Sequence, residues 1–164
     1  MKKILVTVLA LGMSACAADQ MGNQSEPQAP GDEPAAVSEN QVPVSPEYLA
    51  SEKYQQAQQM MRDHGIPRHA PCGTTGPNLQ NQVIADAAAG SGGANQRNGT
   101  IANSSTNCPI LGVLQPTDDA RYFCWTLAND GFTWTFAQNT RTGVRGWTRD
   151  NLLAQFGSNR NCGF

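Results

Sequence analysis

The chain has 164 residues, of which 39% are hydrophobic, 15% are charged and 7% are aromatic, and its formal charge is −2. This length allows one folded domain and excludes a large two-domain enzyme. A nucleic-acid-binding protein is excluded by the slight negative charge, because such proteins carry an excess of Lys and Arg to neutralise phosphates. No apolar run of about 18 residues follows the N-terminal start, so we expect no internal transmembrane helix.

The N-terminus has the pattern of a secretory signal over residues 1–15. Two lysines precede a short apolar stretch over 4–11, and small residues follow it. This order is typical of a signal peptide. The sequence Met13-Ser14-Ala15-Cys16 resembles the bacterial lipobox, which implies cleavage before Cys16 and attachment of diacylglycerol to its sulfur. An ordinary signal peptide with an A-x-A cleavage site ending at Ala17 is the alternative.

The cysteine count and the residue after Cys16 indicate where in the cell the protein is located. The chain has five cysteines, and using Cys16 for lipid leaves an even set of four. We expect export across the inner membrane and a lipid anchor in the cell envelope. Ala17 stands where an inner-membrane retention Asp would stand, so in a Gram-negative organism the outer membrane is the expected location.

Residues 16–45 have the composition of a disordered, acidic, proline-rich tether. Between 19 and 45 there are five acidic residues and four prolines, with no basic and no aromatic residue. Such a segment buries too little apolar surface to offset the entropy of ordering it. It would space the folded part from the lipid surface, although filler without a required length is an equal alternative.

One amphipathic helix is predicted over 46–64. Ser45 is a typical N-cap, Pro46 suits the first helical position, and Gly65 is a stop signal. We expect its apolar stripe to pack on the chain's own domain, while a partner site is the alternative. The stripe consists of Leu49, Tyr54, Ala57, Met60 and Met61.

Short strands separated by turns follow after residue 80. Turns are predicted at 115–118, 129–131 and 139–143, where Pro, Asn, Asp and Gly cluster. Phe132, Trp134 and Phe136 alternate with threonines and should share one face of a strand. This spacing predicts a small barrel or sandwich. The predicted strands are 82–85, 110–114, 120–126, 132–136 and 146–148, with a closing strand at 151–153.

Several segments between 80 and 156 resemble the bacterial SH3 domain. Residues 93–100 are similar to its opening segment, 110–114 and 132–136 to two of its strands, and 142–148 with Leu152 to its closing motif. The resemblance implies an all-β fold over 70–164, a small SH3-like barrel of five to six short antiparallel strands. The family consists mostly of extracytoplasmic modules that bind cell wall or proteins.

Two disulfides are expected from the four remaining cysteines. A hairpin that pairs Leu114 with Asp118 would place Cys108 opposite Cys124. The termini of an SH3 barrel approach each other, so the resemblance implies Cys72–Cys162 as the second bridge. The two rings would stabilise the domain by restricting the unfolded chain.

No catalytic pattern is present in the sequence. There is no Gly-x-Ser-x-Gly motif, no phosphate-binding loop and no zinc-binding cluster, and His64 and His69 lack a Cys or carboxylate at ligand spacing. A reactive Cys72 with either histidine as its base is the catalytic alternative. The oxidising compartment and the even cysteine set argue against it. We therefore expect no enzyme, no metal and no cofactor.

Binding residues are expected among the aromatic and arginine side chains of the C-terminal domain. A narrow barrel buries only one face of its strands, so some aromatic residues should reach the surface. Arginine beside aromatic residues suits contacts with proteins or glycans, whereas ordinary surface arginines are the alternative. The candidates are Tyr122, Phe123, Trp125, Phe132, Arg97, Arg121 and Arg145.

These features predict a monomeric, non-catalytic lipoprotein of the cell envelope. Its SH3-like domain would bind peptidoglycan or an envelope protein, and no nucleic acid. A secreted structural or inhibitory protein that caps an envelope enzyme is the alternative, followed by a small hydrolase.

Overall fold

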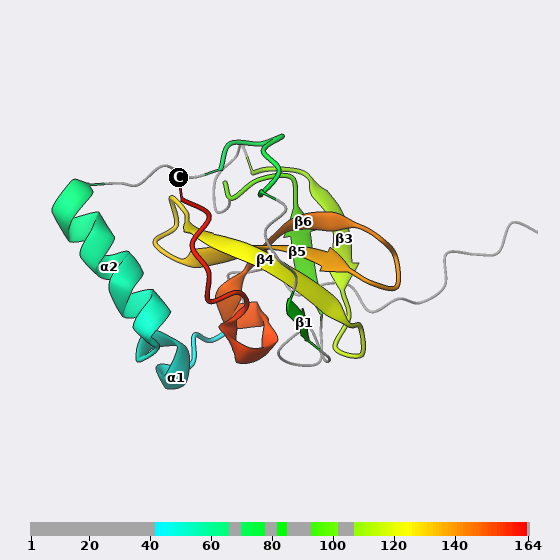
Figure 1. Cartoon of the computed structure of the whole chain (residues 1–164), viewed down its shortest axis with the longest axis horizontal. Helices are drawn as coiled ribbons and strands as arrows, with labels where there is room; N and C mark the ends of the chain where they lie inside the picture. The colour runs from blue at the N-terminus through cyan, green and yellow to red at the C-terminus, as the bar shows by residue number, and fades with distance from the viewer. Residues whose placement is uncertain (1–41, 66–69, 78–81, 85–92, 102–106, 164) are drawn as a thin grey trace, which may run out of the picture. The chain divides into compact units, whose positions relative to one another are not determined.

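A computed structural model of the chain describes residues 42–65, 70–77, 82–84, 93–101 and 107–163 (Figure 1). The predicted signal peptide, the lipidation site Cys16, almost all of the tether and His69 lie outside these described residues. None of the described helices is long and apolar enough to cross a membrane. In chain order the elements are α1 (Pro46–Leu49), α2 (Glu52–His64), β1 (Gln82–Ile84), β2 (Ala94–Arg97), β3 (Ile110–Leu114), β4 (Ala120–Leu127), β5 (Thr133–Asn139), β6 (Arg145–Arg149), and the 3-10 helices η1 (Asp150–Leu152) and η2 (Ala154–Phe156).

The strands form one antiparallel sheet in the order β1-β4-β5-β6-β2-β3. The prediction of an all-β fold is confirmed, and five predicted strands agree with observed ones to within a few residues. The predicted closing strand at 151–153 is wrong, because this segment begins with the 3-10 helix η1. β1 and β3 remain at opposite ends of the order, so the sheet is open. The predicted hairpin between 110–114 and 120–126 is wrong, because β3 pairs with β2 while β4 pairs with β1 and β5.

Both faces of the central strands are buried. On one face, a first core packs against the 3-10 segment near Leu152, and the last part of the predicted tether joins it through Val42. On the other face, residues 70–77 cover a second core, where a Cβ on Gly76 would lie only 2.6 Å from Phe136. The first core contains Ala94, Leu114, Ala120, Tyr122, Ala137, Leu152 and Leu153, and the second contains Ala70, Phe123, Ala128, Trp134, Phe136 and Trp147.

The predicted helix is confirmed in extent but is divided in two. Ser45 caps α1 by accepting a hydrogen bond from Tyr48 N (3.1 Å), and Gly65, with a φ of +77°, ends α2. Ser51 interrupts the helix because its hydroxyl donates to Tyr48 O (2.7 Å) and caps α2. The interruption buries Tyr48 and leaves Leu49 40% exposed, so Leu49 does not belong to the buried stripe.

The rest of the helical stripe packs on the chain's own sheet, as predicted. Ala57 is buried against Trp125 and Leu127, and Met60 and Met61 contact the same cluster. Figure 1 shows α2 beside the hairpin of β4 and β5. Because the helices cover this part of the sheet, the expectation that only one strand face is buried is wrong.

Two disulfides are present, but their pairing differs from the prediction. The bridges are Cys72–Cys108 and Cys124–Cys162, not Cys72–Cys162 and Cys108–Cys124. The register explains the difference, because Cys108 precedes β3, which does not lie beside β4. Oxidation agrees with an extracytoplasmic compartment.

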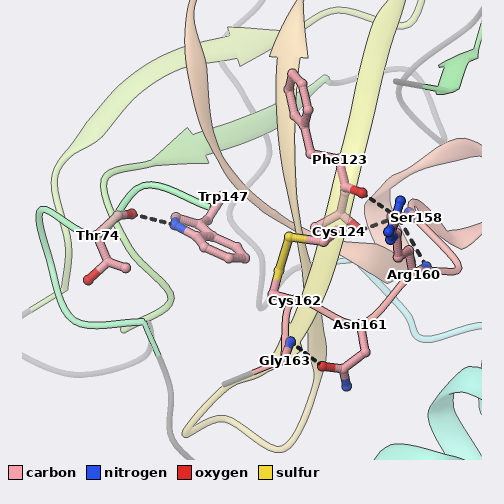
Figure 2. Close-up of a disulfide and its surroundings, with 10 residues drawn as sticks. Thr74, Phe123, Cys124, Trp147, Ser158, Arg160, Asn161, Cys162 and Gly163 are labelled. Atoms are coloured by element: carbon pink, nitrogen blue, oxygen red, sulfur yellow. Dashed lines mark hydrogen bonds between the residues drawn. A yellow bond between two sulfur atoms is a disulfide. The ribbon is translucent and has the colours of Figure 1, made fainter. Parts of the chain in front are cut away.

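The C-terminal tail lies along β4 and brings Cys162 to Cys124 (Figure 2). Trp125 N donates to Arg160 O (2.7 Å), and Cys162 N donates to Trp125 O (2.8 Å). The tail therefore pairs with β4 as a short parallel segment. In the same view Trp147 donates from its indole nitrogen to Thr74 O (2.7 Å), which holds the 70–77 segment over the second core.

Candidate functional site

Three of the predicted binding residues are not available to a partner. Tyr122, Phe123 and Trp125 are each at most 2% exposed. A bulge between Tyr122 and Cys124 shifts the register of β4, and the cores described above cover both sides of the strand. Their assignment as surface binding residues is wrong. Phe132 is half-buried between the helices and the β4–β5 turn.

Arg97 is also a structural residue and not a surface one. It is 8% exposed, and its Nη1 donates to Cys108 O at 2.8 Å. Its backbone pairs with Trp147 where β2 meets β6. A guanidinium in this position stabilises the segment that carries the Cys72–Cys108 bridge, so the prediction that Arg97 contacts a ligand is wrong.

The two remaining candidates, Arg121 and Arg145, lie on one face of the sheet. Arg121 on β4 pairs in register with Gln138 on β5, and Gln138 pairs with Arg145 on β6. Residues directly opposite each other in neighbouring strands project from the same face. Both arginines are exposed. We name the surface formed by Arg121, Gln138, Thr140 and Arg145 the arginine face.

Arg145 is held in place by its neighbours. Its guanidinium carbon lies 5.4 Å from the centroid of the buried Phe123 ring, and its Nη2 donates to Gln138 Oε1 at 3.5 Å. Cation–π stacking orients a guanidinium without occupying all of its donors. Phe123, which was predicted to contact a ligand, therefore packs beneath the guanidinium of Arg145 and orients it.

A shallow depression of about 150 Å³ opens beside Arg121 and is lined by Arg121, Gln138 and Thr140. The Thr140 hydroxyl donates to Asp119 O at 2.9 Å, which fixes the rim. Within the part of the chain that the structure describes, the Arg121 guanidinium makes no hydrogen bond or ion pair. The depression therefore presents unpaired positive charge to solvent.

The buried acid in the turn before β4, Asp118, does not neutralise this charge, because its carboxylate binds other groups. Its carboxylate accepts from Arg141 Nε (2.5 Å), Asn139 Nδ2 (2.6 Å) and Gln115 N (2.9 Å). Burial alone would raise the pKa of Asp118, but these hydrogen bonds outweigh burial and hold the pKa below its ordinary value of 3.8. Asp118 therefore shapes the turn that precedes β4.

A buried ion pair occupies the other end of the β4–β5 hairpin. Lys53 Nζ of α2 lies 2.7 Å from Asp150 Oδ2, and the Asp150 side chain is fully buried. The same ammonium donates to Phe156 O and to Ser158 O (2.8 Å for Ser158). Three acceptors satisfy the three donors of a lysine. Lys53 thus fastens α2 to the segment that follows β6, and its ammonium has no donor left for a ligand.

A second charged pair lies close to the first. Asp130 accepts from the Trp134 indole nitrogen (3.2 and 3.1 Å to its two oxygens), and Arg149 Nη1 lies 3.9 Å from it. Arg149 stacks on Phe132 at 4.1 Å. Burial raises the pKa of Asp130, and the Phe132 backbone N–H, Arg149 and Trp134 oppose that rise. The side chains of Asp130 and Arg149 are buried, so we assign them a structural role.

Sequence analysis missed both buried pairs. Lys53 was not singled out in the sequence and Asp130 was noted only as part of the 129–131 turn, because contacts between α2 and distant segments are not visible in the local pattern. In the described ranges no three His, Cys, Asp or Glu residues are grouped to hold a metal ion.

The chain matches no protein-family model, and no curated protein or solved structure matches it either.

Proposed function

We propose that the protein is a non-catalytic binding module of the cell envelope, which presents the arginine face to cell wall or to an envelope protein. The observation that carries the proposal is the in-register row of Arg121, Gln138 and Arg145 on an exposed part of the sheet. Arginine is favoured at binding surfaces because its planar fork makes several directed hydrogen bonds.

The architecture supports a module that acts by surface contact. Some of its charged residues are buried in fixed pairs, as Lys53 and Asp150 are, and others, such as Arg121 and Arg145, are exposed to solvent. We further propose that the open sheet is a divergent, unclosed variant of the SH3-like barrel, supported by the antiparallel strands and the closing segment at 142–148. Fold alone does not specify a ligand, so the arginine face must be tested directly.

We propose that export and lipid attachment at Cys16 place the module at a membrane surface, in the outer membrane if the organism is Gram-negative. The two disulfides support an oxidising compartment. A Cys16→Ser variant should leave the membrane fraction while keeping both bridges. Retention of that variant in the membrane fraction would contradict lipid anchoring.

The proposed function is tested by two binding measurements on the same protein. Purified cell wall is incubated with the chain and sedimented, and separately the chain is used to capture envelope proteins, each of which is then tested as a purified component. Sedimentation with cell wall, or direct binding of one purified envelope protein, is the expected result. Failure in both measurements would contradict a binding role.

A further inference from the structure

We infer that the arginine face binds an extended acidic segment of a partner protein, with Arg121 and Arg145 each taking one carboxylate. This inference rests on the proposed function and specifies its ligand. It follows from the spacing of the two guanidinium groups, from their free donors and from the charge that surrounds them.

The spacing suits two carboxylates on an extended peptide. Neighbouring strands lie about 4.8 Å apart, so the backbones of β4 and β6 at Arg121 and Arg145 are separated by about 10 Å across Gln138. Alternate side chains of an extended peptide project to one side about 6.7 Å apart. Arginine side chains are long enough to close this difference, so a peptide that crosses the strands can reach both.

The donors are also suited to carboxylates. Arginine binds a carboxylate through two parallel N–H···O bonds, and Arg145 is already oriented for this by Phe123 beneath it. Gln138 lies between the two charges as a neutral amide; its Oε1 accepts from Arg145 and its Nε2 donates to Gly143 O, so it separates the two arginines without adding charge. Single negative charges placed apart match this arrangement better than one doubly charged group would.

The surrounding charge leaves the face positive. Asp118 is committed to Arg141, Asn139 and Gln115, and among the described residues no ion pair joins Asp119 to Arg121. The depression of about 150 Å³ is open to solvent and is large enough for a side chain of the peptide. An acidic chain lying across the face meets all of these conditions.

The test uses the full chain and a synthetic peptide of alternating glutamate and serine, with acetylated and amidated ends. A peptide with glutamine in place of each glutamate is the neutral control. Binding is measured by titration calorimetry at low salt and again at about 0.15 M salt, where screening weakens exposed ion pairs. The wild-type chain should bind the acidic peptide, should ignore the neutral one, and should bind more weakly at the higher salt concentration.

The variant for this test is the double substitution Arg121→Gln/Arg145→Gln. It should weaken binding of the acidic peptide about tenfold, because two exposed charge pairs are lost. The matched control, Arg62→Gln/Arg160→Gln, removes the same charge from exposed residues elsewhere and should leave the affinity within about twofold.

Two results would overturn the inference. One is equal binding of the acidic peptide by the wild type and the Arg121→Gln/Arg145→Gln variant. The other is sedimentation with purified cell wall by a chain that does not bind the acidic peptide, which would leave the proposed function intact with a different ligand. A chain that binds neither cell wall, nor an envelope protein, nor the peptide would refute both the inference and the proposed function.

Discussion

Charged side chains are buried in an ion pair at one end of the β4–β5 hairpin and exposed to solvent at the other end. At the end next to the helices, Lys53 and Asp150 are nearly or completely removed from water and bind each other. At the far end, Arg121 and Arg145 project into solvent from the same sheet. Burial of an ion makes its removal costly for stability, whereas an exposed ion contributes little to stability and is available to a ligand. The comparison separates residues that hold the fold from residues that can bind.

The first prediction tests the enclosed end. Lys53→Met should lower the free energy of unfolding by about 3 to 5 kcal/mol, because it leaves the buried Asp150 carboxylate without a counter-ion. Burial already raises the pKa of Asp150 against the opposing charge of Lys53. The loss should therefore become smaller as the pH falls and Asp150 takes up a proton.

Urea unfolding at several pH values measures this effect. Arg62→Met, on an exposed position of the same helix, is the control and should change stability by less than about 0.5 kcal/mol. Equal losses for the two variants would show that the Lys53–Asp150 pair does not fasten α2.

The second prediction concerns the two disulfides. Replacing either pair by serines, as Cys72→Ser/Cys108→Ser or Cys124→Ser/Cys162→Ser, should cost about 2 to 4 kcal/mol through the entropy of the unfolded chain. The sequence separations are 36 and 38, so the two bridges should reduce the entropy of the unfolded chain by nearly the same amount. A difference between the two losses in stability would therefore show which packs more favourably on the sheet, the 70–77 segment or the C-terminal tail. Non-reducing peptide mapping should recover the same two pairs, and a Cys72–Cys162 peptide would contradict the register described above.

The third prediction concerns Asp118, a buried carboxylate whose ion-pair partner, Arg141, is exposed. Asp118→Asn should lower the free energy of unfolding by about 1.5 to 3 kcal/mol near neutral pH, since charge-assisted hydrogen bonds are lost. The pKa of Asp118 is lower in the folded chain than its ordinary value of 3.8, so its stabilisation is present above that pH and is lost as the pH falls through the folded pKa. The difference between wild type and variant in urea unfolding should therefore shrink as the pH is lowered beyond 3.8, and a difference that stays constant on acidification would argue against an ionised Asp118.

The smallest expected effect is at the arginine face. Arg121→Gln/Arg145→Gln should change the free energy of unfolding by no more than about 0.5 kcal/mol, since both side chains are exposed. The same urea measurement checks this, and it validates the variant for binding work. A large loss would mean that these arginines belong to the scaffold, as Arg97 does.

The local features of the fold were predictable from sequence because they depend on neighbouring residues. Ser45 and Pro46 start α1, and Gly65 ends α2, as helix capping requires. The turn at 129–131 and the shared face of Trp134 and Phe136 also follow from local pattern. These predictions are confirmed.

The long-range features were not predictable in the same way. Nothing in the local pattern shows that β3 pairs with β2 at the edge of the sheet and not with β4, and this pairing separates Cys108 from Cys124. The covering of both faces of β4 was not predicted for a similar reason. An alternating strand such as β4 indicates two faces, but what covers each face depends on α2 and the tail. Three of the proposed binding aromatics were therefore wrong, while Arg121 and Arg145 are exposed as expected.

The connectivity of the bridges has a consequence for biogenesis. Cys72 joins Cys108 and Cys124 joins Cys162, so each cysteine pairs with the next one along the chain and the two rings do not overlap. If the chain is exported from its N-terminus, as proposed above, each of these four thiols would meet its native partner before any later cysteine emerged. Such an order favours correct oxidation in a single pass, without the slow reshuffling that interleaved bridges require.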